Sequence, residues 1–273
     1  MQRRGAPTTL PVDIPFDYSL AVLRGDDVIL SIGNTRLVRP LASVTKVCAA
    51  WATLIGVDRS MLRLDDSAGP PGSTIRHLLA HASGLPADSR EPLFAPGKRR
   101  VYSNAGFDVL GDAVEQATGT PIGRWIDETL FEPLGMSSAL VPASPAHSGE
   151  ASIEDLIVLA NELLHPALLT PGLAVEAATI QFPELAGVVP GYGRHTPCPW
   201  GLGVEVKGGK SPHWTGVGAD PATFGHFGVS GSFIWVDRVN NAAAVFLGAE
   251  PFGPWHKENW SPLNDYLLAL ARS

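Results

Sequence analysis

The sequence predicts an α+β fold: an antiparallel sheet formed by both chain ends, flanked by helices, with an inserted and mostly helical lobe. Two observations predict it. Apolar runs with strand character occur near the start of the chain and again in its last third, and blocks of helical periodicity fill the middle. We therefore expect a discontinuous sheet domain, residues 1–56 and 196–273, and a helical lobe, residues 57–195.

The first strands are expected at residues 18–24 and 28–32. The turn-forming cluster Gly25-Asp26-Asp27 joins them, which is typical of a hairpin. After Pro40 the pattern changes to an Ala-rich apolar block, residues 43–55, which ends at Gly56. Such a block is typical of a buried helix, and it carries a serine in its first turn.

Helical spacing continues through the middle of the chain, in blocks separated by Pro/Gly-rich connectors. Strand patterns then return, and an apolar-periodic helix ends the chain. Helices are expected at residues 75–82, 107–117, 153–164 and 263–271, and further strands at 201–206, 233–237 and 242–247.

The composition favours a globular enzyme that acts on a small substrate. The 273 residues are 45% hydrophobic and 17% charged, and the formal net charge is -7. Lys98-Arg99-Arg100 is the one notable basic run, which argues against nucleic acid or an anionic membrane as the main partner. A small ester, an amide or a peptide-like molecule is the expected substrate, and the oligomeric state is left open.

Nothing in the sequence predicts export or membrane insertion. Met1 to Arg4 is basic, but residues 5–17 lack the continuous apolar stretch of a signal peptide. No segment offers the roughly 18 consecutive apolar residues of a spanning helix. The cytoplasm is therefore the expected compartment.

No metal or other cofactor is expected. Cys48 and Cys198 lack the neighbours that a thiol-based site or a Cys/His metal cluster needs. His77 and His81 have the spacing of a metal pair on a helix, but no carboxylate or third histidine is placed to complete a site.

Ser43 and Lys46 form the only Ser-x-x-Lys motif in the chain. On a helix this spacing places the two side chains on one face, about 5–6 Å apart at Cβ. A serine hydroxyl needs a nearby base to take its proton, and a desolvated lysine with a lowered pKa can do so. A capping serine beside a solvated lysine is the alternative, but an ammonium is costly to bury in so apolar a helix. We expect Ser43 to be a nucleophile with Lys46 as its proton partner.

Tyr102-Ser103-Asn104 is the only Tyr-x-Asn motif, and it lies in a connector just before an expected helix. A tyrosine can relay the serine proton if nearby ammonium groups favour its phenolate. An asparagine amide can orient a lysine or hold a substrate carbonyl. The alternative is an aromatic packing residue followed by a helix-capping asparagine.

His226-Phe227-Gly228 precedes Val229 and an expected strand. Glycine lets a ligand approach the backbone closely. If this segment forms a strand edge facing Ser43, the N–H groups of Ser43 and Val229 would form an oxyanion hole. A packed or capped histidine is the alternative interpretation.

The order and approximate separation of these three motifs resemble those of the penicillin-recognising serine hydrolases. The stretches between them resemble the class C β-lactamase-related branch, which includes DD-peptidases, aminopeptidases and esterases. The resemblance covers about residues 17–270, and the matching stretches are residues 78–86, 96–97, 102–119 and 130–136.

The resemblance implies a β-lactamase/transpeptidase-like fold and a role for each motif residue. Ser43 would be acylated, Lys46 would be its proton partner, Tyr102 would be the general base, and Asn104 would contact substrate. His226 stands where β-lactamases of this class usually carry a lysine and several peptidases carry a histidine. Because a histidine is only partly charged near neutral pH, this departure disfavours an efficient β-lactamase.

We therefore expect a serine hydrolase that cleaves small carboxylic esters or amides through an acyl-enzyme on Ser43. Two alternatives stay open. One is a D-aminopeptidase, a DD-carboxypeptidase or a weak β-lactamase. The other is a non-catalytic ligand-binding (sensor) module of the same fold. The intact Ser43, Lys46 and Tyr102 favour an enzyme, because a sensor would be free to lose them.

Overall fold

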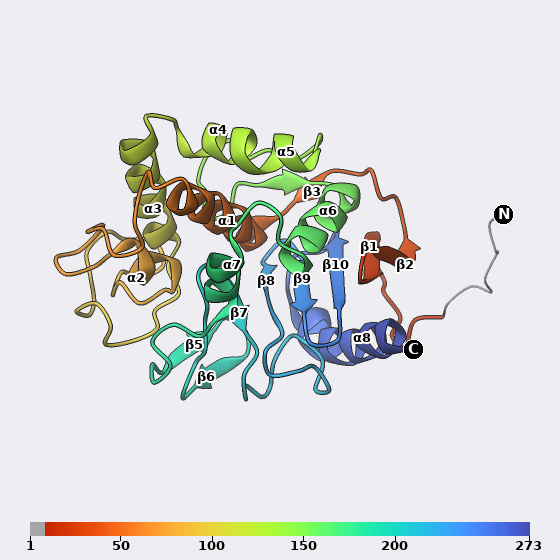
Figure 1. Ribbon diagram of the computed structural model, residues 1–273. Helices are drawn as coiled ribbons and strands as arrows, with labels where there is room; N and C mark the ends of the chain where they lie inside the picture. The colour runs from red at the N-terminus through yellow and green to blue at the C-terminus, as the bar shows by residue number, and fades with distance from the viewer. Residues whose placement is uncertain (1–8) are drawn as a thin grey trace.

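A six-stranded antiparallel sheet forms the centre of the computed structural model, which describes residues 9–273 (Figure 1). Its strand order is β2-β1-β10-β9-β8-β7. The strands are β1 (Tyr18–Arg24), β2 (Asp27–Ile32), β7 (Glu205–Val206), β8 (Phe224–Gly228), β9 (Ser232–Asp237) and β10 (Ala242–Gly248). The predicted α+β class, with one sheet built from both chain ends, is confirmed; the basic start of the chain lies outside the described residues.

Pairing between β1 and β10 joins the two ends of the chain. Tyr18 lies opposite Gly248 and Arg24 lies opposite Ala242, so β1 is paired along its whole length. The predicted hairpin places β2 on the other edge of β1. A strand from the start of the sequence is thereby built into a sheet made mostly from its last quarter.

The two faces of the sheet support separate apolar cores. Side chains alternate along a strand, so Ile234 and Val236 of β9 face one side while Phe233 and Trp235 face the other. Helices α1 (Thr45–Asp58) and α6 (Ile153–Leu164) cover the first face, and α8 (Pro254–Arg272) covers the second (Figure 1). Because both faces are covered, β8, β9 and β10 are buried throughout.

Most of the remaining helices lie beyond α1, on the side away from α8, whereas α7 (Pro171–Ala178) lies between α1 and β7 in this view (Figure 1). Helix α6 falls within the residues expected to form the lobe, yet it packs on β1, β9 and β10. The helices are α2 (Ile75–Leu79), α3 (Asn104–Thr118), α4 (Ile122–Ile126), a π-helical turn (Asp127–Phe131), α5 (Glu132–Leu134) and α7 (Pro171–Ala178). Two small sheets pair β3 (Arg39–Pro40) with β4 (Glu150–Ala151), and β5 (Gly187–Val189) with β6 (Gly193–His195).

Several expected elements have other bounds in the structure, and for three of them the local reason is clear. Helix α3 begins earlier than predicted because the Ser103 hydroxyl accepts a hydrogen bond from Gly106 N at 2.8 Å and caps it. Helix α8 also begins earlier, at Pro254, a residue type favoured in a first helical turn. The strand expected at residues 201–206 keeps only its last two residues, because Gly203 N donates to Leu79 O of α2.

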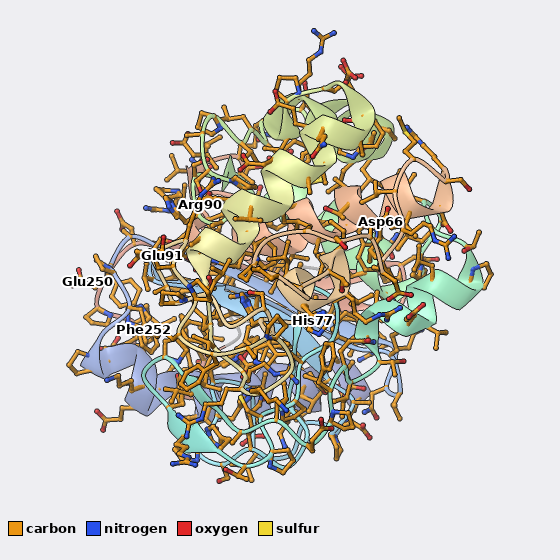
Figure 2. All side chains as sticks on the ribbon, turned by 90° about the vertical axis from the view of Figure 1, so that its left-hand side faces the viewer. Asp66, His77, Arg90, Glu91, Glu250 and Phe252 are labelled. Carbon is orange, nitrogen blue, oxygen red and sulfur yellow. The ribbon has the colours of Figure 1, made fainter. Side chains whose placement is uncertain are left out.

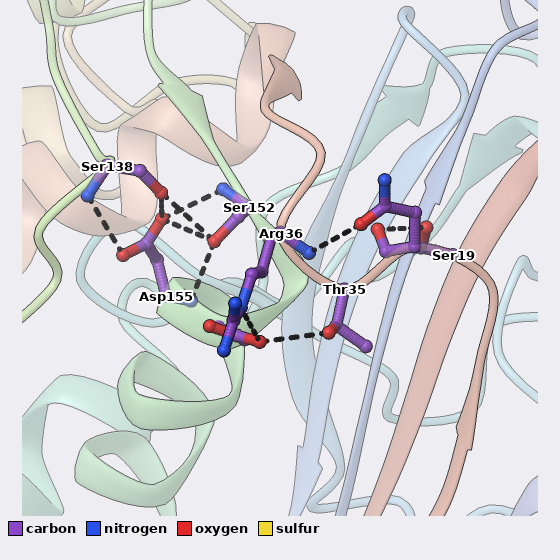
Figure 3. A network of polar contacts seen from close by, with 8 residues as sticks. Ser19, Thr35, Arg36, Ser138, Ser152 and Asp155 are labelled. Carbon is purple, nitrogen blue, oxygen red and sulfur yellow. Dashed lines mark hydrogen bonds and ion pairs between the residues drawn. The ribbon is translucent and has the colours of Figure 1, made fainter.

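A polar network fixes the start of α6 (Figure 3). Ser152 caps the helix: its hydroxyl accepts from Asp155 N at 3.2 Å, and the Asp155 carboxylate accepts from Ser152 N at 2.9 Å. Ser138 donates to the same carboxylate. Nearby, the exposed Arg36 pairs with Glu154 at 3.2 Å. The network connects the segment that precedes Ser43 to the helix that covers the sheet.

Within residues 9–273, no helix has the length and apolar character that a bilayer-spanning segment requires.

Candidate active site

Ser43 lies on a single 3-10 turn, Ala42–Val44, that leads directly into α1. The turn starts from unusual backbone geometry, because Ala42 has a φ of 45°, in the left-handed region that non-glycine residues rarely adopt. Ser43 is mostly buried, with 9% of its surface exposed, and it lines a small pocket between α1 and β8. The serine is therefore held at one defined position rather than on a mobile loop.

Gly228, the last residue of β8, lets the serine turn approach the sheet. A Cβ at this position would lie 2.3 Å from Leu41 O and 2.5 Å from Ser232 Oγ, so no larger residue fits. The Ser232 hydroxyl donates to Leu41 O at 2.8 Å. Glycine and serine together hold the residues before Ser43 against the end of β8.

Lys46 is fully buried one turn after Ser43. Its side-chain nitrogen donates to Asn104 Oδ1 at 2.7 Å and to Ala146 O at 2.8 Å, and it lies 3.4 Å from Ser43 Oγ. Burial lowers the pKa of Lys46 to about 7, although Asp108 and Asp88 partly offset the effect. An uncharged amine is therefore available beside the serine near neutral pH.

Tyr102 and Asn104 approach Lys46 from the start of α3. The Lys46 nitrogen lies 4.7 Å from the centre of the Tyr102 ring. The Tyr102 hydroxyl is buried and has no hydrogen-bond partner among the described residues. Burial raises the pKa of Tyr102 well above its ordinary value, and the nearby Ser43 hydroxyl offsets this only in part. Tyr102 is thus a neutral phenol at physiological pH.

His226 points from β8 towards the serine face of the sheet and lines the same pocket. Its Nδ1 donates to Phe227 O at 2.7 Å, which leaves Nε2 as a bare acceptor, and Nε2 has no partner in the part of the chain that the structure describes. Burial, with Lys46 adding to the effect, lowers the pKa of His226 to about 3. The expectation of a partly charged group was wrong, because this buried imidazole is neutral at physiological pH.

Val229 follows β8 at the mouth of the pocket, with 61% of its surface exposed. Its carbonyl accepts from Phe252 N at 2.9 Å. Across residues 9–273, neither its N–H nor that of Ser43 donates a hydrogen bond to another residue. Both residues line the serine pocket.

The tertiary structure therefore brings together all seven residues that the motifs single out. Ser43, Tyr102, His226 and Val229 line one pocket, whose other lining residues are Pro190, Trp200, Glu205 and Phe227. Lys46 and Asn104 lie behind Ser43, and Gly228 supports it from the sheet.

Comparison with known proteins agrees with this geometry. A family model described as Beta-lactamase matches residues 18–261. The chain belongs to the β-lactamase family. A crystal structure described as a β-lactamase from Mycobacterium bovis is 43% identical, covers 95% of this chain and 97% of its own, and superposes with a TM-score of 0.93. The family resemblance and the fold expected from the sequence are confirmed, and the chain is a hydrolase of this family.

More distant relatives carry different names. A protein of Salmonella enteritidis PT4, provisionally named a D-alanyl-D-alanine carboxypeptidase, is 26% identical over 70% of this chain. The chain spans 60% of that relative's length. A D-stereospecific amidohydrolase from Streptomyces sp. shares the fold with a TM-score of 0.71 at 19% identity, covering 89% of this chain and 92% of its own.

One group in this β-lactamase-family pocket was missed by sequence reasoning. Glu205 is buried and lines the pocket, and its carboxylate accepts from Lys210 Nζ at 2.7 Å, His213 Nε2 at 3.1 Å and Trp214 Nε1 at 2.7 Å. Burial alone would raise the pKa of Glu205, but Lys210 and His213 outweigh it and hold the pKa well below its ordinary value. The signal in the sequence that could have revealed Glu205 is a single acidic residue within a Gly-rich apolar stretch.

The candidate metal pair does not share a helix. Helix α2 ends at Leu79, and His81 has a φ of 53°, so the regular helical spacing from His77 is lost. His77 stacks on Phe182 with ring centres 4.7 Å apart, whereas His81 Nδ1 accepts from Ser103 N at 3.2 Å. No group of three metal-ligating side chains occurs in the described part of this β-lactamase-family chain.

Proposed function

We propose that this protein hydrolyses small carboxylic esters or amides through an acyl-enzyme on Ser43. The observation that carries the proposal is the 3.4 Å approach of the buried Lys46 nitrogen to Ser43 Oγ, with burial lowering the pKa of Lys46 to about 7. A lysine in this state accepts the serine proton near neutral pH, which turns a weak nucleophile into a competent one.

The proposed reaction has two stages. In the first, Ser43 Oγ bonds to the substrate carbonyl carbon while its proton moves to Lys46, and the oxyanion accepts from the Ser43 and Val229 N–H groups. Collapse of this intermediate breaks the bond to the leaving group, which takes up the proton. In the second stage water attacks the acyl-enzyme by the same route, releasing the acid and restoring the serine.

The protonation states of Tyr102 and Lys46 support catalytic roles that differ from those implied by the family resemblance. The raised pKa of Tyr102 disfavours a phenolate base, while the lowered pKa of Lys46 favours an amine base. We assign Tyr102 to donating a hydrogen bond towards the leaving group while keeping its own proton, and the leaving group takes up the proton held by Lys46. Asn104, bonded to Lys46 at 2.7 Å, would orient the amine.

The neutral His226 supports esters and simple amides rather than β-lactams as the preferred substrates. A neutral imidazole on β8 supplies no fixed cation beside Ser43 for a substrate carboxylate. The second candidate is a D-peptidase activity, which the names of the Salmonella and Streptomyces relatives favour.

Intact-mass spectrometry tests the proposal. The wild-type protein and the Ser43→Ala variant are incubated with a fluorophosphonate probe and, separately, with a penicillin. The control is Ser230→Ala, which removes a hydroxyl beside the pocket. A probe adduct on the wild type and on Ser230→Ala, but not on Ser43→Ala, is expected. An additional penicillin adduct would shift the substrate class towards D-peptides, and labelling that survives in Ser43→Ala would overturn the assignment.

A further inference from the structure

The basic run Lys98-Arg99-Arg100, which has no part in the proposed reaction, is divided by the fold. Arg100 is buried, and its guanidinium donates to the backbone carbonyls of Gln181 at 2.6 Å and Cys198 at 3.0 Å. Arg100 therefore has a structural role. Arg99 is exposed, and its guanidinium donates no hydrogen bond to any of residues 9–273.

Strand pairing places Arg99 on the same surface as a second arginine. Arg100 bridges to Gly187 in parallel, and across the β5–β6 hairpin Val188 lies opposite Arg194. Side chains alternate between faces along a strand. Because Arg100 points inward, Arg99 points outward, to the face that carries the exposed Val188 and Arg194.

These residues line a cleft with apolar walls. The cleft encloses about 550 Å³, a size that suits a small organic ligand. Leu93, Phe94 and Val188 form its apolar lining, and Arg99 and Arg194 supply positive charge. The Arg99 guanidinium lies 5.2 Å from the centre of the Phe94 ring, which positions it over an apolar surface.

The cleft adjoins the serine pocket. Tyr102 and Pro190 line both, so a ligand in the cleft extends towards Ser43. Among residues 9–273, neither Arg99 nor Arg194 forms an ion pair; Arg90, on the loop beside the cleft and labelled in Figure 2, is instead paired with Asp112 at 2.7 Å. The formal net charge of the chain is -7. The two arginines therefore make this apolar cleft locally positive on a chain that is negative overall.

We propose that this cleft is the substrate subsite and that it binds an anionic group at the end of an apolar chain. The preferred substrate is then an ester or amide whose apolar chain, remote from the scissile bond, ends in a carboxylate. The guanidinium groups bind the carboxylate, and the Leu93 and Phe94 side chains cover the chain. The inference rests on the proposed function in one respect: Ser43 must be the nucleophile that the bound substrate reaches.

A kinetic comparison tests this preference. The substrates are p-nitrophenyl hydrogen glutarate and its neutral counterpart p-nitrophenyl butyrate, and the measured quantity is the ratio of their kcat/KM values. We expect a ratio of about ten or more for the wild type, decreasing with added salt, and a roughly tenfold smaller ratio for the Arg99→Gln/Arg194→Gln double variant. The Arg63→Gln/Arg124→Gln double variant, which removes two exposed arginines elsewhere, controls for net charge. Equal ratios in the wild type and the double variant would overturn the subsite.

A binding measurement separates failure of the subsite from failure of the proposed function. Calorimetric titrations of Ser43→Ala compare 5-phenylvalerate with its uncharged amide, both in this variant and in one that also carries Arg99→Gln and Arg194→Gln. We expect the anion to bind about tenfold more tightly than the amide only when both arginines are present. If the anion binds more tightly than the amide but the wild type hydrolyses no ester, the esterase proposal is rejected and the subsite is kept. If the two probes bind equally, the subsite is rejected.

Discussion

The Lys46 side-chain nitrogen donates to Asn104 Oδ1 across 2.7 Å, although the two residues are 58 positions apart in the sequence. The contact joins α1 to the start of α3, where the Ser103 hydroxyl caps the helix. A buried amine with two firm acceptors and the Ser43 hydroxyl nearby has little freedom to move. The predicted chemistry depends on the protonation of this amine.

Activity should rise with pH through about 7 if Lys46 is the base. Burial lowers the pKa of Lys46 to about 7, so below that pH the amine carries a proton and cannot accept another from Ser43. We expect kcat/KM for a neutral ester to increase about tenfold per pH unit below this pKa and to level off above it. Initial rates measured from about pH 5 to about pH 9, a range that spans this pKa, give the pH profile. A profile that stays flat or falls across pH 7 would contradict the assignment.

Replacement of Lys46 by arginine tests the same assignment without removing the positive charge. Arginine stays protonated at any accessible pH, so it cannot take the serine proton. We expect Lys46→Arg to lower kcat by at least about 100-fold, the usual contribution of a general base. Circular dichroism establishes whether the variant folds, and near-normal turnover in a folded variant would exclude Lys46 as the base.

Replacement of His226 by lysine should increase reactivity towards penicillins relative to esters. The wild-type imidazole is neutral because burial and Lys46 lower its pKa to about 3. An ammonium in its place would attract the carboxylate of a β-lactam, and a gain of roughly tenfold corresponds to about 1.4 kcal/mol. The measurement is the rate of penicillin adduct formation divided by the rate of ester hydrolysis. His226→Gln, which adds no charge, is the control; an unchanged ratio in His226→Lys would be the contrary result.

Gly228→Ala should impair catalysis more than the addition of a single methyl group suggests. The new Cβ would meet Leu41 O at 2.3 Å and push the serine turn away from β8. Overpacking of this kind costs about 1–3 kcal/mol, and a displacement near 1 Å in an active site can lower the rate about 100-fold. Gly209→Ala, where a Cβ would meet no atom within 4 Å, is the matched control. Parallel measurement of kcat and Tm tests the prediction, which fails if the two variants behave alike.

Glu205→Gln should destabilise the fold. The substitution leaves the buried Lys210 ammonium without its carboxylate, and breaking a buried ion pair in this way costs about 3–5 kcal/mol. The contribution of Glu205 is present above its ordinary pKa of 4.5 and is lost as the pH falls, because the folded state holds its pKa below that value. Urea unfolding measures the change, with Arg124→Gln at an exposed ion pair as a control. A loss no greater than that of the control would contradict the argument.

The sequence by itself determined the architecture and the nucleophile region of this protein. The apolar runs of the strands, the Ala-rich apolar block of α1 and the 3.6-residue spacing of α6 are local properties, so the two-ended sheet and its covering helices could be predicted. The three motifs also predicted which side chains would meet around Ser43. Their catalytic roles stay predictions until the variants are measured.

Only the tertiary structure decided the electrostatics. Whether His226 is charged depends on how completely other segments exclude water from it, and local sequence does not specify that burial. The ion pair of Glu205 with Lys210 and the opposite directions of Arg99 and Arg100 depend on strand pairing between distant segments. The charge state of a side chain depends on desolvation, which occurs only when distant segments pack around it. The direction of a side chain depends on which face of a paired strand it occupies, and this pairing exists only in the assembled fold.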